Sequence, residues 1–261
     1  MPRSSAGSFL LGRIPSSIRA KEYFQNYVLD AHAETALKRA AREDARNYVY
    51  NAAISFLSAM GGLRTQQAGW AITKLYYCAF YIGRASLCRA DHIIFHAPKF
   101  PANGNTQYEI KILAGQRAAV TKNPSTHKQV AIKFQQFGYP PFMRGLTIDS
   151  TDPISWLMDK REYWQYRAAR FPDPDFPQIL DKIEMNKTQR LLEEYSTDTS
   201  GVYLADPAHA ILSVPFRLLI WALSQGSLIS PGCISEKDIM YLRKRCHVGK
   251  HTLTTISRHL K

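Results

Sequence analysis

The sequence lacks the short motifs that mark most nucleotide-binding enzymes and many hydrolases. It contains no G-x-x-x-x-G-K-[ST] loop for phosphates and no G-x-G-x-x-G fingerprint for dinucleotides. A G-x-S-x-G elbow, where an α/β-hydrolase carries its nucleophilic serine, is missing as well. We therefore expect neither a P-loop NTPase nor a Rossmann dehydrogenase, and no serine hydrolase of that fold.

Cysteine is scarce, and none of the four cysteines forms a C-x-x-C pair. Cys78 and Cys88 fall in an apolar run, so we expect them to be small buried side chains in a reducing compartment. His247 and His251 are four residues apart and lie next to Cys246, but no Glu follows the first His, so an exposed basic helix is the more ordinary interpretation. The sequence predicts no metal site and no cofactor.

Long hydrophobic runs are also missing. No window reaches the roughly 18 uncharged apolar residues of a membrane span, and the closest, residues 208–223, contains Arg217. The apolar stretch at residues 9–11 is too short for a signal peptide. We expect a cytoplasmic protein that does not enter a membrane.

Positive charge, in contrast, is abundant. The 34 Lys and Arg residues outnumber the 21 Asp and Glu residues, which gives a net charge of +13. The chain has 261 residues and is 45% hydrophobic, enough for a packed core in one large or two small domains. An excess of this size favours a polyanionic partner, either nucleic acid or an acidic protein.

Helical periodicity covers most of the chain. Residues 1–20 are rich in Ser and Arg, and we expect them to be mobile. The predicted helices lie at residues 20–60, ending at Gly61-Gly62, and at 65–90, 127–137, 154–174, 177–195, 207–225 and 235–261. The helix at 65–90 is apolar on nearly every side, so it should be central and buried.

Only a short part of the chain alternates as a strand does. Residues 108–113 alternate, and residues 92–95 read as a second extended piece, so a hairpin is expected at about 92–113. The predicted fold class is therefore all-α, with residues 21–261 as a single helical domain that carries a small β-hairpin insertion.

Two arginine pairs, Arg161 with Tyr166 and Arg89 with His96, are candidates for chemistry on a phosphodiester. Metal-free RNA cleavage needs a base for the 2′-hydroxyl proton and a cation for the phosphate. Tyr166, with an ordinary pKa near ~10, is a poor base beside Arg161, so catalysis there would need His127 or His96. The candidate catalytic residues are Arg161, Tyr166 and His127, and the candidate nucleic-acid-binding residues are Arg89, His96, Arg167 and Arg170. The alternative for each pair is a structural ion pair at a helix end.

Helix geometry limits how Arg161 and Tyr166 can share one site. In an ideal α-helix, five residues turn the chain so that Arg161 and Tyr166 lie about 140° apart. A site that uses both would then need a second helix or a second subunit, which favours a homodimer or a complex.

The run WAITKLYYCAFYIGRASL at residues 70–87 resembles the buried helix of HEPN-domain proteins, especially their YaaC-like branch. YEIKILAG, WLMDKREYWQYR and the late LSQGSLISP follow in a similar order, so the resemblance covers about residues 65–231. It implies a HEPN-like helical bundle, frequent dimerisation, and often a ribonuclease toxin of prokaryotic defence or toxin–antitoxin systems. The family pattern of Arg, a polar residue and a later His would place Tyr166 at the histidine position, whereas Arg89 and His96 keep the spacing.

Three functions stay open on this basis. A metal-independent endoribonuclease predicts a basic groove that holds Arg161, Tyr166 and a histidine within hydrogen-bond reach. A non-catalytic adaptor that binds nucleic acid or a larger effector protein predicts Arg161 buried against Glu162 or Asp159, with positive charge spread over an outer face. The third function is a sensor of small nucleotides.

Overall fold

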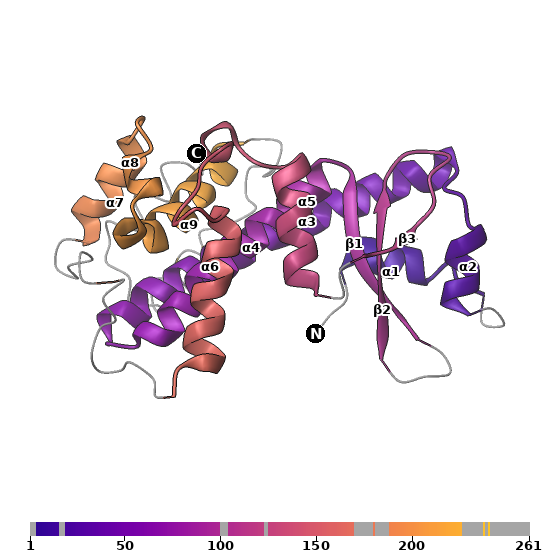
Figure 1. The fold of residues 1–261 in the computed structure, drawn as a ribbon. Helices are drawn as coiled ribbons and strands as arrows, with labels where there is room; N and C mark the ends of the chain where they lie inside the picture. Colours follow the sequence, from indigo (N-terminus) through magenta and orange to yellow (C-terminus); the bar gives the residue numbers. More distant parts are fainter. Residues whose placement is uncertain are drawn as a thin grey trace. The chain divides into compact units, whose positions relative to one another are not determined.

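The computed structural model describes residues 4–15, 19–99, 104–122, 125–169 and 188–225, together with Leu180, Lys237 and Met240. These residues are mostly helical and include one small antiparallel sheet (Figure 1), which confirms the predicted helical class with a β insertion. The helices are α1 (Ser5–Leu11), α2 (Ala20–Asn26), α3 (Ala31–Arg64), α4 (Ala68–Arg89), α5 (Thr126–Phe137), α6 (Pro153–Glu162), α7 (Thr188–Thr197), α8 (Val202–Ala205) and α9 (Pro207–Ser224). The strands, in sheet order, are β1 (His92–Pro98), β2 (Asn105–Lys111) and β3 (Ala119–Val120).

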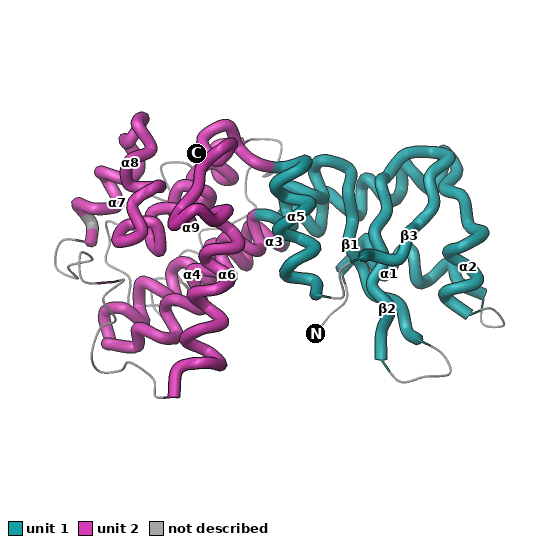
Figure 2. The backbone as a smooth tube through the Cα atoms, in the orientation of Figure 1, with its two compact units in different colours: residues 1–47, 83–138 teal, residues 48–82, 139–261 magenta. Residues whose placement is uncertain are grey.

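The chain divides into two compact units (Figure 2). Unit 1 contains residues 1–47 and 83–138, and unit 2 contains residues 48–82 and 139–261. The long helices α3 and α4 each contribute residues to both units. A local sequence pattern cannot reveal such a division, because each helix is continuous across it.

Unit 1 is built on the sheet. β1 and β2 pair in antiparallel register, with Phe95 opposite Tyr108. Phe24 of α2 packs against both rings, at centroid distances of 5.2 Å and 5.1 Å. Residues two apart in a strand share a face, so Glu109 lies on the opposite side of the sheet from Tyr108. There Glu109 accepts a hydrogen bond from Gln129 of α5, which places the sheet between α2 and α5.

Helix α1 is anchored by a side chain from α3. The buried carboxylate of Asp44, only 3% exposed, accepts hydrogen bonds from the backbone N–H groups of Ser5 (2.6 Å) and Ala6 (2.9 Å). Ala6 and Leu10 are fully buried. Within the segment 1–20, which we expected to be mobile, residues 5–11 thus form a helix with buried side chains. The contact that orders α1 comes from a residue 38 positions away, so no local pattern announces it.

Unit 2 is built around α4 and α9. Ile72 and Leu75 of α4 are fully buried, and the thiol of Cys78 contacts the carbonyl of Pro215 in α9. This agrees with the predicted buried central helix, except that Trp70 at its start is 54% exposed. Among the described residues, α9 is the one helix long and apolar enough to cross a membrane, but 61% of it is buried inside the structure, as in many core helices.

Two predicted helix ends were placed wrongly. Helix α3 continues past Gly61-Gly62 to Arg64, and neither glycine adopts the left-handed conformation that would end a helix. Helix α6 ends at Glu162 and continues only as a π-helical turn, η2 (Tyr163–Arg167). Residues 170–174, also predicted to belong to that helix, lie outside the described residues, as do most of 177–187 and 235–261.

Candidate nucleic-acid interface

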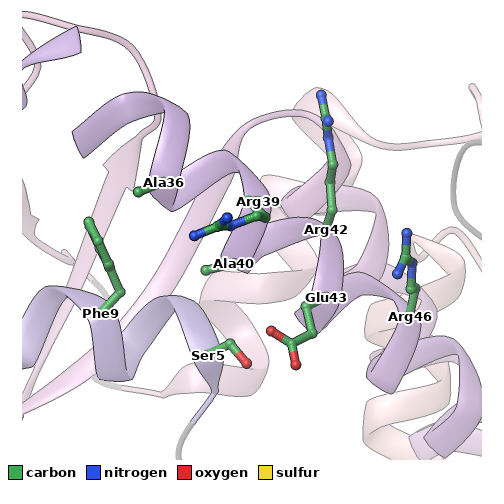
Figure 3. Close-up of a pocket in the computed structure, with 8 residues that line it drawn as sticks. All are labelled: Ser5, Phe9, Ala36, Arg39, Ala40, Arg42, Glu43 and Arg46. Atoms are coloured by element: carbon green, nitrogen blue, oxygen red, sulfur yellow. The ribbon is translucent and has the colours of Figure 1, made fainter. Parts of the chain in front are cut away.

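Three arginines form a stripe along one side of α3. Arg39, Arg42 and Arg46 are spaced by three and four residues, so their side chains fall on the same helix face. All three are exposed. They line a cavity of about 660 Å³, which we call the arginine groove; its lining residues are Ser5, Phe9, Ala36, Arg39, Ala40, Arg42, Glu43 and Arg46 (Figure 3).

The groove forms where α1 meets α3. The small side chains of Ala36 and Ala40 leave space on α3, and Phe9 of α1 supplies an aromatic wall. In Figure 3 the Arg39 side chain extends toward Phe9, whereas the Glu43 carboxylate turns to the side of Ser5. Three cations and one anion leave an excess of two positive charges in the groove.

Guanidinium groups in such a stripe suit phosphate groups. Each presents a planar set of N–H donors that matches two phosphate oxygens at once. The sequence signal for this site is the R-x-x-R-x-x-x-R spacing at residues 39–46. This spacing alone does not predict a binding site, because charged residues at helical spacing usually form a solvent-exposed helix face. Only the docking of α1 turns this face into a groove.

The candidate Arg161 lies in unit 2 and is buried, with its side chain 6% exposed. Its guanidinium carbon lies 5.0 Å from the ring centroid of Tyr76 and 5.8 Å from that of Tyr166. Its Nη2 is 3.4 Å from Oε1 of Glu162. The buried Nε has no hydrogen-bond partner among the described residues. Burial raises the pKa of Tyr76 despite the nearby Arg161 charge, so this phenol stays protonated and is no base.

Arg161 and Tyr166 lie closer than an ideal α-helix predicts, because the Arg161 guanidinium carbon is 5.8 Å from the centroid of the Tyr166 ring. Residues 163–167 form a π-helical turn, closed by a hydrogen bond from the Ala168 N–H to the Tyr163 carbonyl (2.8 Å). A π-helical turn winds by less than the ~100° per residue of an α-helix, so the angle expected for an ideal α-helix does not apply here. The two side chains therefore meet within one segment, and their contact requires neither a second helix nor a second subunit. Tyr166 itself is 71% exposed.

The candidate His96 belongs to a chain of polar side chains in unit 1. Its Nε2 lies 3.1 Å from Oγ1 of Thr126. Gln107 donates to the same hydroxyl oxygen (2.6 Å) and accepts from the hydroxyl of Thr121 (2.7 Å). Burial, and next the charge of Arg84, lower the pKa of His96. The lowered pKa favours the neutral imidazole, whose tautomer decides whether Nε2 donates to or accepts from the Thr126 hydroxyl.

The remaining candidates are divided between the two units. His127 is half-buried at the start of α5, directly after Thr126, and Arg89 is exposed in the last turn of α4; both belong to unit 1. Arg167 is exposed in η2, and Arg170 lies outside the described residues. The predicted catalytic set thus has His127 in unit 1 and Arg161 and Tyr166 in unit 2.

Unit 2 contains a single histidine among its described residues. The only described histidine of that unit, His209, is engaged through Nδ1 with the hydroxyl of Tyr195, at 2.8 Å. Across the described part of the chain, no group of three or more His, Cys, Asp or Glu side chains could hold a metal ion. Compared with known proteins, the chain matches no family model, no curated protein and no solved structure.

Proposed function

We propose that this protein is a HEPN-like helical module that binds RNA, mainly through its phosphates, in the arginine groove of α3. The observation that carries the proposal is the stripe of Arg39, Arg42 and Arg46, three exposed guanidinium groups that line one cavity. The net charge of +13 supports it, because long-range attraction concentrates a polyanion near the surface.

Binding without cleavage is the alternative that the geometry favours. Arg161 is buried against Glu162, as the adaptor hypothesis requires, and not presented in a groove beside a histidine. We therefore propose a cytoplasmic adaptor that joins RNA to a protein partner in a prokaryotic defence complex. Its placement in defence rests on the HEPN resemblance of residues 65–231.

The test is a comparison of two triple variants. One replaces Arg39, Arg42 and Arg46 by Gln; the control replaces Arg19, Lys21 and Lys122, which are also exposed in unit 1 and carry the same total charge. Binding of a labelled single-stranded RNA is measured by fluorescence anisotropy between ~50 and ~200 mM salt, where phosphate-driven affinity falls steeply.

We expect the groove variant to lose about 10-fold or more in affinity, and the control variant to lose much less. If all three arginines contact phosphates, the slope of log affinity against log salt should become shallower by about 2, at ~0.7 per contact. Equal losses in both variants would show that only overall charge matters. Wild-type protein that binds no RNA at low salt would contradict the proposal itself.

Cleavage is tested on the same RNA. We expect the RNA to stay intact during long incubation with the wild-type protein. If cleavage appears and disappears in Arg161→Ala or His96→Ala, the endoribonuclease alternative replaces the adaptor.

A further inference from the structure

Tyr76, Arg161 and Tyr166 form a cation–π cluster in unit 2, which we call the Tyr166 stack. The guanidinium carbon of Arg161 lies over both rings, 5.0 Å from the centroid of Tyr76 and 5.8 Å from that of Tyr166. Tyr76 is buried, whereas Tyr166 is 71% exposed. The stack therefore begins in the core and ends at the surface with an aromatic ring.

This arrangement costs stability in several ways. A π-helical turn has poorer packing than an α-helix and is uncommon outside functional sites. Two polar atoms of this segment, Nε of Arg161 and Oε1 of Gln165, are buried and have no hydrogen-bond partner among the described residues. A buried polar atom without a partner opposes folding. The π-helical turn and the two unpartnered atoms each oppose folding. Because such costs often occur at functional sites, this segment with its exposed ring is a candidate ligand-binding site.

We propose that the outer face of Tyr166 is a stacking platform for an unpaired nucleobase, and that the protein therefore prefers single-stranded RNA over duplex RNA. This inference rests on the proposed function and specifies its ligand. The Arg161 guanidinium lies over this ring, 5.8 Å from its centroid, as a cation–π partner does. With 71% of Tyr166 exposed, ring surface remains for a base.

The neighbouring residues suit such a ligand. Arg167 follows Tyr166 directly, and its side chain is 65% exposed, so it can reach the phosphate of the stacked nucleotide. The acidic Glu162 is shared by Arg161 and Arg167, at 3.4 Å and 3.6 Å. Its charge is thus balanced. Aromatic stacking accepts any base but requires an unstacked one, which a duplex does not offer.

The test measures affinity for a single-stranded RNA and for the matching duplex, at one salt concentration, in wild type, Tyr166→Ala, Tyr166→Phe and the control Trp70→Ala. Trp70 is an aromatic residue of the same unit with comparable exposure, 54%. Far-UV circular dichroism and thermal melting confirm that each variant is folded. We expect Tyr166→Ala to lose about 5- to 100-fold in single-strand affinity, the usual range for one stacked base, with duplex affinity unchanged.

Tyr166→Phe should bind like wild type, because it keeps the ring, and so should Trp70→Ala. If Tyr166→Ala binds the single strand as tightly as wild type while the groove variant has lost binding, the proposed stacking platform is contradicted. The proposed RNA binding in the arginine groove is then supported. A Trp70→Ala loss as large as that of Tyr166→Ala would also overturn the platform. If the wild-type protein binds neither RNA, the proposed function fails and the platform with it.

Discussion

The carboxylate of Asp44 holds one wall of the arginine groove in place. It accepts hydrogen bonds from the first two N–H groups of α1, and burial raises its pKa although these bonds lower it. Asp44→Ala leaves both N–H groups without this acceptor, so we expect a loss of about 1 to 3 kcal/mol in the free energy of unfolding. Urea denaturation measures this loss. Glu43→Ala, at the exposed neighbouring position, is the control and should change stability little.

His96 makes stability depend on pH. Its pKa in the folded protein lies below the ordinary value of 6.5, because burial opposes the charged form. Between these two pKa values the unfolded state binds more protons than the folded state, so stability falls as the pH drops through this window. We expect the melting temperature of wild type to fall between pH 7 and pH 5 more than that of His96→Gln. Equal slopes for the two proteins would contradict this role.

At the scale of single elements, the helices that local chemistry defines were predicted well. Ser125 caps α5, and Asp206 with Pro207 begins α9, as their sequence signals indicate. Helix α1 depends on Asp44 far along the chain, and β3 has only two residues, so neither leaves a readable periodic pattern. The arginine groove was missed for the same reason, since it exists only once α1 has docked.

The π-helical turn η2 could not be predicted from the sequence, because residues 163–167 are compatible with a continued α-helix. The turn directly follows the buried Arg161. We expect Arg161→Ala to lower the free energy of unfolding by about 2 to 4 kcal/mol, because it removes the contacts with Tyr76 and Tyr166 and leaves a cavity. Arg167→Ala, exposed in the same turn, should cost less than ~0.5 kcal/mol. Chemical denaturation of both variants measures these free energies of unfolding. If Arg161→Ala is as stable as wild type, Arg161 is not a structural residue and becomes a catalytic candidate again.

At the scale of the whole molecule, the excess of positive charge and the two units bear on the proposed RNA binding in separate ways. The +13 charge predicts attraction of any polyanion but no preference among them. Preference has to come from local geometry, which here means the arginine groove in unit 1 and the Tyr166 stack in unit 2. The sequence predicted the partner class from charge alone, whereas the position of the groove depends on packing between distant segments.

The sharing of α3 and α4 between the units sets the order in which the protein can be completed during synthesis. Unit 1 has all its residues once the ribosome has passed position 138, but residues 48–82 of unit 2 are made long before their partners. Phe56 on α3 stacks against Phe216 on α9, at a centroid distance of 5.4 Å. At ~5–20 residues per second, this phenylalanine waits roughly ten to thirty seconds for its partner. The nascent chain therefore carries an uncovered apolar surface for that time, which makes it a substrate for chaperones that bind such surfaces.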